Sequence, residues 1–287
     1  MDSLRLKFNS VGSLVIVLGI SLFASAAHSL GGTSGSKLVT PCTDTVPPGK
    51  IELEPYLSVG SVSHGYDGDF SRYDLGLRHR TVESGFRYTV GLLDNLELGL
   101  ITPIVFARMM VDDAPDIAAA GLGDIPLGLK WRFWESEPAE LALQVGTLVP
   151  SGYSNGDDEQ GVLALGDGST VPEIGLVSTV MPVDALTIDV SLTGGVAFPT
   201  TRDGDPTWVA ALDLALGYAI GPFQPVVEVN QALGGWGGLD DYVLSTNLGF
   251  TYELKGPVIV VTGVGIDLVG KSVDQGWSYN LAFTILL

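Results

Sequence analysis

The sequence predicts an all-β fold, a transmembrane antiparallel up-and-down β-barrel of about 12 strands. Three observations predict it: an export signal, short segments of alternating hydrophobicity, and connections whose lengths alternate between short and long. The composition agrees, because only 16% of the 287 residues are charged while the mean hydropathy is +0.34 and the net charge is -19. A soluble acidic protein would have to hide unusually much apolar surface, whereas a membrane accommodates it.

The N-terminus has the three parts of a secretory signal peptide. Arg5 and Lys7 are followed by an apolar core over residues 11–23 and by small residues over 24–27. No other run reaches the ~18 apolar residues that a membrane-spanning helix needs. We therefore expect an exported protein of a Gram-negative outer membrane with three regions: a signal peptide over 1–27, a periplasmic N-terminal leader over 28–49, and an outer-membrane β-barrel over 50–287.

Twelve segments alternate in hydrophobicity over roughly ten residues, the length that a tilted strand needs to cross the hydrocarbon layer. They are residues 50–59, 80–91, 96–106, 121–134, 139–150, 170–180, 185–197, 207–218, 223–233, 242–254, 257–268 and 276–287.

The connections between these segments alternate in length. Five are short and rich in Gly, Pro, Asn and Asp, as hairpin turns require: residues 92–95, 135–138, 181–184, 219–222 and 255–256. The six between them are longer: residues 60–79, 107–120, 151–169, 198–206, 234–241 and 269–275. This pattern predicts short periplasmic turns and long outer loops, with both termini on the periplasmic side.

Alternation also separates a lipid-facing side from a luminal side. In the stretch GLGDIPLGLKWRFW the lipid-facing side is Ile125, Leu127, Leu129, Trp131 and Phe133, and the luminal side is Asp124, Gly128, Lys130 and Arg132. Aromatic residues are expected at the two membrane interfaces. They are Tyr88, Trp131, Phe133, Tyr218, Phe223 and Tyr252 beside short turns, and Phe106, Trp208, Tyr242 and Trp277 beside long loops.

Three segments are similar to those of a known exported family: residues 45–55 (TVPPGKIELEP), 91–103 (GLLDNLELGLITP) and 121–133 (GLGDIPLGLKWRF). The chain resembles the MetA-pathway of phenol degradation family, whose members are described as outer-membrane transporters. The resemblance covers most of the mature chain as a pattern of strand and turn residues. It implies a β-barrel transporter and brings no catalytic residues with it, and the phenol label of the family rests on gene context.

Motifs that would indicate an enzyme are weak. The GLGD stretch opens like a dinucleotide fingerprint, but Pro126 stands where the third Gly belongs and the following residues alternate with period two. Residues 152–156 (GYSNG) match a nucleophile elbow, which would need His64 or His79 to reach Ser154 across the rim. A loop turn is the simpler interpretation, so we expect no enzyme and no cofactor.

The sequence also limits the binding partners. Cys42 is the single cysteine, which excludes an internal disulfide and a multi-thiolate metal site, and we expect it as an unpaired thiol in the leader. Metal-ligand spacings and basic clusters for nucleic acid are lacking. Acidic pairs in the long loops are solvated charge, or they share divalent cations with anionic lipopolysaccharide or repel anionic solutes. The expected partners are outer-membrane lipid, lipopolysaccharide and a small-molecule solute, with the oligomeric state left open.

The side assigned to the interior is strongly acidic. Its carboxylates are Glu52, Glu54, Glu83, Glu97, Asp124, Glu140, Glu173, Asp189, Asp213, Glu228, Glu253 and Asp267, against the bases Arg87, Lys130 and Arg132. Isolated carboxylates in lipid are costly, so these positions line water or pair with the bases. They either fill a narrow barrel or line a cation-favouring aqueous path, and we favour a narrow path. The expected constriction is formed by Arg87, Lys130 and Arg132 facing Glu97, Glu140 and Asp124.

These features predict an outer-membrane channel for passive uptake of small solutes, with hydrophobic or aromatic compounds as candidate substrates. The alternative is a non-conducting barrel that serves structure, adhesion or membrane integrity, its lumen closed by salt bridges.

Overall fold

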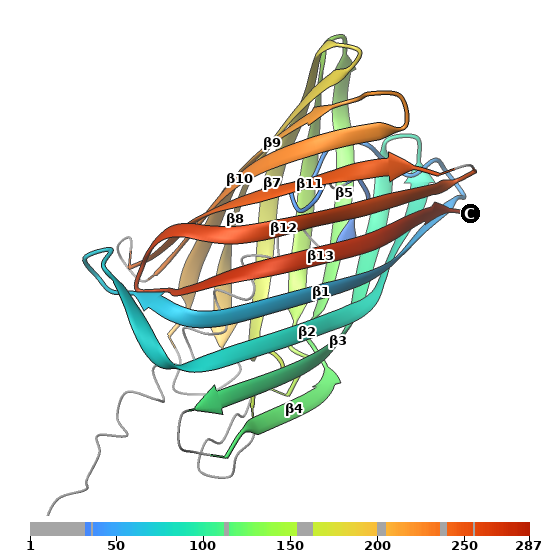
Figure 1. Ribbon diagram of the computed structural model, residues 1–287. Helices are drawn as coiled ribbons and strands as arrows, with labels where there is room; N and C mark the ends of the chain where they lie inside the picture. The colour runs from blue at the N-terminus through green and yellow to red at the C-terminus, as the bar shows by residue number, and fades with distance from the viewer. Residues whose placement is uncertain are drawn as a thin grey trace, which may run out of the picture.

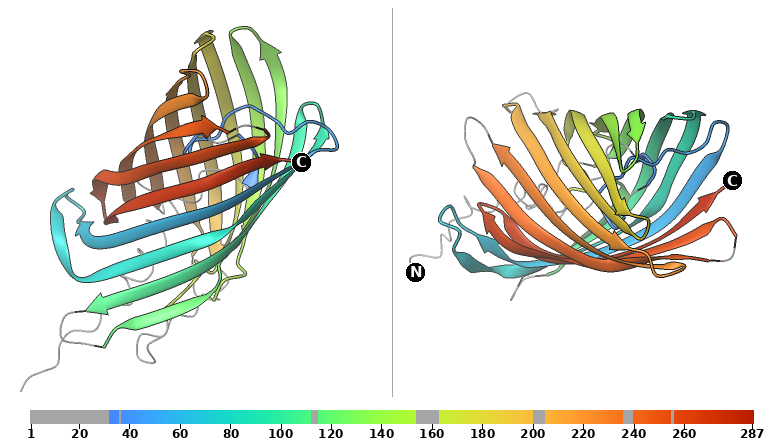
Figure 2. Two further views of the ribbon diagram at one scale, coloured as in Figure 1. Left: turned by 45° about the vertical axis from the view of Figure 1, so that its right-hand side comes forward. Right: turned by 90° about the horizontal axis from the view of Figure 1, so that it is seen from above.

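The computed structural model describes residues 32–35, 37–111, 115–153, 163–199, 205–235, 240–254 and 256–287. The signal peptide assigned to residues 1–27 therefore lies outside the described residues. The strands form one antiparallel sheet that curves round a common interior (Figures 1 and 2). They are β1 (Ile51–Tyr66), β2 (Arg72–Leu93), β3 (Leu96–Val111), β4 (Ile117–Leu122), β5 (Ile125–Ser136), β6 (Ala139–Val149), β7 (Ser169–Val183), β8 (Leu186–Pro199), β9 (Thr207–Tyr218), β10 (Phe223–Gly235), β11 (Asp241–Glu253), β12 (Val258–Lys271) and β13 (Asp274–Leu286).

The sheet closes on itself. β1 pairs with β13 on one side and with β2 on the other, so the first and last strands join. β4 and β5 both pair with β3 and together occupy one position in the wall. The result is a closed 12-strand antiparallel barrel, which confirms the predicted fold class. Among the described residues, no helix has the length and apolar character needed to span a membrane.

The two ends of the barrel differ. The C-terminus lies at the end where the connections are short: residues 94–95, 137–138, 184–185, 219–222 and 254–257. The opposite end carries the longer connections: residues 112–116, 150–168, 200–206 and 236–240. Because outer-membrane barrels have short periplasmic turns, we name the first the periplasmic end and the second the outer end.

Some strands extend further at the outer end than the sequence predicts. Loops are predicted over residues 60–79 and 269–275, but the strands continue and leave only residues 67–71 and 272–273 between them. Beyond the hydrocarbon layer both faces of a strand meet water, so its side chains need not alternate. The pattern from which strands are predicted is therefore lost while the backbone pairing continues.

The wall strand predicted over residues 121–134 is interrupted between β4 and β5 at Gly123 and Asp124. The Asp124 side chain is 5% exposed. Its carboxylate accepts hydrogen bonds from the backbone N–H groups of Gly152, at 2.8 Å, and Asp167, at 2.7 Å. The interruption thus anchors both ends of the connection between β6 and β7.

In the middle of the barrel, most side chains that point inward are polar, and most that point outward are apolar. Lys130, Glu97 and Glu228 are among the largest fully buried side chains, each 0% exposed. Ile104 and Leu192 on the outer surface are 58% and 57% exposed. A soluble protein has the reverse arrangement, so the outward face is suited to hydrocarbon.

Aromatic side chains mark the two interfaces. Eight of the ten predicted girdle residues are exposed on the outer surface: Tyr88, Trp131, Phe133, Tyr218, Phe223 and Tyr252 towards the periplasmic end, and Phe106 and Trp277 towards the outer end. Trp208 and Tyr242 are only partly exposed, and the Tyr242 ring lies 6.0 Å from that of Phe70, centre to centre. The exposed rings bound an apolar belt, as expected for a barrel in a bilayer.

Candidate functional site

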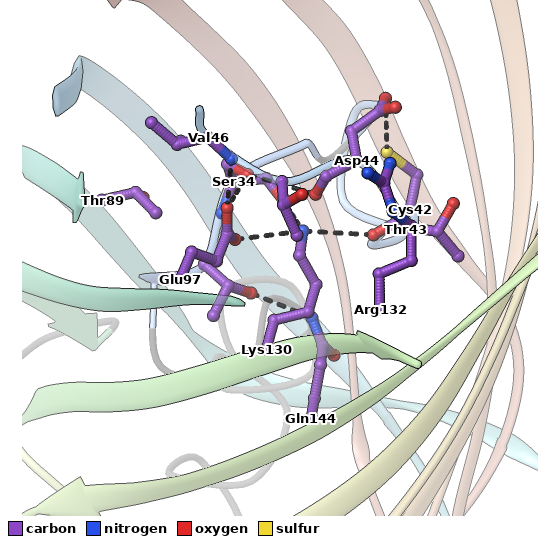
Figure 3. Close-up of polar contacts among 12 residues, drawn as sticks. Ser34, Cys42, Thr43, Asp44, Val46, Thr89, Glu97, Lys130, Arg132 and Gln144 are labelled. Carbon is purple, nitrogen blue, oxygen red and sulfur yellow. Dashed lines mark hydrogen bonds and ion pairs between the residues drawn. The ribbon is translucent and has the colours of Figure 1, made fainter. Parts of the chain in front are cut away.

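Residues 32–35 and 37–46, called the luminal segment below, lie inside the barrel (Figures 2 and 3). Sequence analysis places them in the periplasmic leader. They hydrogen-bond instead to side chains of β2, β3, β5, β6, β7 and β10. The backbone N–H groups of an extended segment need acceptors, and the acidic wall supplies them in a space that excludes solvent.

A buried ion pair holds both ends of the luminal segment (Figure 3). Glu97 Oε1 and Lys130 Nζ lie 3.1 Å apart, on directly opposed residues of β3 and β5. The Glu97 carboxylate also accepts from Ser34 N and Val46 N, each at 2.7 Å. Lys130 Nζ donates to the carbonyl oxygens of Ser34, at 2.7 Å, and Cys42, at 3.3 Å. The pair is fully hydrogen-bonded only while the segment is in place, so pair and segment stabilise each other.

Across the lumen, a second carboxylate binds the middle of the segment. Glu228 accepts hydrogen bonds from three successive backbone N–H groups: Leu38 at 2.8 Å, Val39 at 3.1 Å and Thr40 at 3.2 Å. Asn230 Nδ2 donates to the Thr40 hydroxyl at 3.3 Å. Consecutive N–H groups that converge on one anion form a favourable site for negative charge.

The wall between these two anchors adds further hydrogen bonds. Thr43 N donates to Thr179 Oγ1 at 3.0 Å, and that hydroxyl donates to Asp189 at 2.6 Å. The Thr43 hydroxyl donates to Glu140 Oε2 at 2.6 Å. The luminal segment is therefore bonded on several sides and narrows the interior where it crosses.

Two wall glycines admit the segment. A Cβ at Gly99 would lie 2.3 Å from the carbonyl carbon of Gly32, and a Cβ at Gly91 would lie 2.2 Å from the carbonyl oxygen of Val46. These distances leave no room for a larger residue, since the backbone itself occupies the space. The glycines are thus part of the surface that receives the segment.

Cys42 is buried within the segment and 2% exposed. Its backbone N–H donates to Gly35 O at 2.8 Å, and its thiol lies 3.1 Å from Asp44 Oδ2. Burial, with a contribution from the Asp44 carboxylate, raises the pKa of the Cys42 thiol well above its usual value. The thiol is therefore protonated at neutral pH and poorly reactive.

Four of the six residues proposed for the constriction lie near one another in two pairs. Glu97 and Lys130 form the buried pair, and Arg132 Nη1 lies 3.7 Å from Glu140 Oε2. Arg132 also lies 3.2 Å from Glu135 near the turn. These residues line one side of the lumen where the luminal segment crosses it.

Arg87 and Asp124 are engaged elsewhere. Arg87 Nη1 lies 2.9 Å from Glu54 Oε1, its cross-strand neighbour in the first hairpin. Asp124 binds the connection between β6 and β7, as described above. The sequence pattern assigns both residues to the luminal side. The strand register places Arg87 beside Glu54, and the interruption between β4 and β5 places Asp124 beside the connection between β6 and β7.

Sequence reasoning did not include the residues of the luminal segment in the site. The run GGTSGS…TPCTDT has no helical or strand periodicity, so it is read as a leader. Glu228 and Asp189 are predicted to face the interior, but nothing in the alternation indicates that an N-terminal segment covers them. The signal that could have found it is its richness in small polar residues, which suits an extended chain packed among carboxylates.

The interior is apolar near the outer end of β2, β3 and β4. Ala107 and Met109 on β3 are buried and pack with Leu163 from the connection between β6 and β7. Leu77, Val111, Ile117, Ala119 and Leu165 extend this cluster. The lumen therefore combines an apolar outer region with a polar middle region.

The residues of the candidate hydrolase motif are only partly described. Ser154 lies outside the described residues. His79 is buried, and His64 Nδ1 lies 2.9 Å from the hydroxyl of Ser63. Within the described ranges, no group of three or more His, Cys, Asp and Glu side chains is placed to hold a metal ion.

Comparison with known proteins gives structural but no sequence relatives. No protein-family description matches the sequence, and no curated protein matches it. The COG4313 outer membrane channel from Pseudomonas putida F1 is similar, with a TM-score of 0.67 and 16% identity over 85% of this chain and 98% of that chain. The protein is an outer-membrane β-barrel.

Two further solved structures share the architecture of this outer-membrane β-barrel. The NanC porin has a TM-score of 0.52 and 8% identity over 81% of this chain and 98% of its own. The translocator domain of the autotransporter NalP from Neisseria meningitidis has a TM-score of 0.51 and 12% identity over 99% of both chains. At these identities the likeness concerns the fold.

Proposed function

We propose that the protein is an outer-membrane channel that takes up small solutes passively, with hydrophobic or aromatic compounds as candidate substrates. The observation that carries the proposal is the luminal segment. Side chains alone fill the smallest barrels, whereas this interior also holds an extended piece of chain. That piece is held by hydrogen bonds and charge, so its displacement leaves a path lined by polar side chains.

The apolar outer region supports the choice of substrate class. On the proposed path, a solute that enters from the outer end passes the apolar cluster of Ala107, Met109 and Leu163 before it reaches the polar middle of the lumen, and the packing of this cluster opens to admit it. Apolar and aromatic solutes are favoured on such a surface because their contact removes apolar area from water.

Two likenesses support transport. One solved structure of similar fold is described as an outer membrane channel. The three segments that resemble the MetA-pathway of phenol degradation family lie at the start of the barrel and along β3 and β5. On this ground we propose that the chain is related to that family of transporters.

The test uses the purified full mature chain in a planar bilayer. We expect single-channel openings when the luminal segment is displaced, and transient interruptions of the open-channel current when phenol or a methylphenol is added. The interruptions should become rarer in Met109→Glu, which places a charge in the apolar outer region. Met110→Glu is the matched control, because it makes the same change one residue along β3 on the outward side.

Three results would contradict the proposal. Absence of current from folded protein would leave the non-conducting barrel as the better account. Interruptions that are equally frequent in both variants would remove the apolar region from the path. A current that phenolic solutes leave unaffected, while sugars of similar size permeate in liposome swelling, would exclude aromatic compounds as substrates.

A further inference from the structure

Three arginines lie together on the outer surface of the barrel wall near its outer end. Arg78 and Arg80 on β2 and Arg108 on β3 all point away from the lumen and are exposed, whereas their neighbour His79 is buried. We call Arg78, Arg80 and Arg108 the arginine patch. β2 and β3 run side by side in this region (Figure 1).

The height of the arginine patch on the wall can be read from the strand pairing. Arg80 is opposite Arg108 on one side and Ser61 on the other, and Ser61 is opposite Trp277. Trp277 is 48% exposed on the outer surface. Phe106, which is 45% exposed, lies two residues from Arg108 towards the apolar belt. Exposed Trp and Phe rings mark the membrane interface, so the guanidinium groups lie at the headgroup level of the outer leaflet.

Among the residues that the structure describes, few negative charges compensate the arginine patch. Like charges directly opposite each other on neighbouring strands destabilise the pairing, and Arg80 faces Arg108. Arg108 forms an ion pair with Asp116, whereas no ion pair of Arg78 or Arg80 occurs in the described part of the chain. This concentration of positive charge stands on a protein with only 14 Lys and Arg and a net charge of -19. An anionic ligand from outside the protein would remove the repulsion.

We propose that the arginine patch binds the phosphate groups of lipopolysaccharide in the outer leaflet. Guanidinium groups bind phosphate oxygens through two parallel hydrogen bonds, with geometry that Lys cannot match. Opposed residues lie about 5 Å apart across the strands and next-but-one residues about 7 Å apart along a strand, so the three side chains are within reach of one headgroup. The arginine patch faces the outer leaflet of the membrane, where lipopolysaccharide supplies phosphate groups.

Direct contact between arginines and phosphate differs from the partner interaction expected from the sequence. The interaction expected from the sequence has loop carboxylates that share divalent cations with lipopolysaccharide. In the interaction proposed from the structure, arginines contact phosphate directly without a metal ion. It is also independent of the proposed transport, since the arginine patch faces lipid and the solute path lies within the lumen.

The test measures binding of lipid A to the full mature chain in detergent that contains EDTA. Native mass spectrometry counts bound lipid A as its concentration is raised. We expect the triple variant Arg78→Gln, Arg80→Gln, Arg108→Gln to bind at least about tenfold more weakly than the unaltered protein, because charge-assisted contacts to phosphate are lost. Lys50→Gln, which removes an exposed cation at the periplasmic end, should bind as the unaltered protein does.

A second arm changes the ligand instead of the protein, so it holds even if the triple variant fails to fold. Lipid A without its two phosphates should bind the unaltered protein at least about tenfold more weakly than lipid A itself, by the same loss of charge-assisted contacts. The proposal is overturned if both forms bind equally, if EDTA abolishes binding, or if the folded triple variant keeps its affinity. Equal binding of phosphatidylglycerol would also overturn it, since it would reflect general attraction to anionic lipid.

Discussion

Lys130 and Glu97 show how single residues stabilise the interior. Both side chains are 0% exposed, and each also bonds to the luminal segment. Burying two charges is costly, and the cost is offset only when every donor and acceptor is satisfied. The pair therefore depends on the segment as much as the segment depends on the pair.

This dependence predicts the effect of Lys130→Met. The substitution leaves Glu97 charged and buried without its cation, so we expect the free energy of unfolding to fall by about 3–5 kcal/mol. Urea titration followed by the gel mobility of the folded barrel measures it. The double variant Glu97→Gln, Lys130→Met should lose less, because no charge remains uncompensated. Equal stability of the single variant and the unaltered protein would contradict the account.

Cys42 reports the position of the luminal segment. Because burial raises the pKa of this thiol, little thiolate is present at pH 8, and the side chain is shielded as well. We expect slow labelling by a small maleimide in the folded protein, faster labelling in Lys130→Met, and full labelling after unfolding. Cys42 is the single cysteine, so mass spectrometry of the intact chain gives the rate directly. Labelling as fast in the folded as in the unfolded protein would show that the segment does not occupy the lumen.

The residues of the site were only partly accessible to sequence reasoning. Alternation places Glu97 and Lys130 on the luminal side of neighbouring wall strands, and the register makes them opposite. Alternation also places Arg87 there, but it cannot tell that Glu54 in the same hairpin is closer than Glu97. Which side chains pair depends on the register of neighbouring strands. Alternation shows which face a residue is on, but a shift of the strand by two residues leaves every residue on the same face, so alternation alone does not fix the register.

Among the elements, the interruption between β4 and β5 has the clearest structural role. The GLGD stretch reads as continuous strand because its alternation carries across Gly123. The backbone leaves the ladder there because Asp124 binds Gly152 and Asp167 instead of continuing the wall. Hydrogen bonds from a side chain to a segment distant in the sequence do not change the local alternation, so they cannot be predicted from it.

Removing this carboxylate should loosen the connection between β6 and β7. In Asp124→Ala two backbone N–H groups lose their acceptor, at a cost of roughly 1–3 kcal/mol for each group left unsatisfied. We expect faster hydrogen exchange over residues 150–153 and 163–169, with the rest of the barrel unchanged. Asp124→Asn, which keeps one acceptor oxygen, should lie between. Unchanged exchange in Asp124→Ala would mean that the anchor is not needed.

The strands were predicted well where they cross the membrane and poorly beyond it. Hydrocarbon on one side and polar side chains on the other impose alternation within the belt. At the outer end β1 and β2 continue past the residues that the pattern marks, because the backbone pairing needs no apolar face there. The limits of a strand can therefore be predicted only where one of its faces is apolar and the other polar, and strand propensity does not extend the prediction further.

For the whole molecule, closure of the wall leaves an interior that the chain itself occupies. The luminal segment is bonded to β3 and β5 on one side and to β10 on the other. Alternation along the strands and the resemblance to a transporter family both predict the barrel. Neither of them indicates that part of the chain occupies its interior. We propose that this segment obstructs the solute path and must move for passage.

Single-channel conductance tests this claim most directly, with the unaltered mature chain compared with a variant that lacks residues 32–46. We expect the variant, confirmed as folded by its gel mobility, to conduct in larger and longer openings, because nothing then crosses the polar middle of the lumen. If the variant conducts no better than the unaltered protein, the luminal segment does not obstruct the path and the account is wrong.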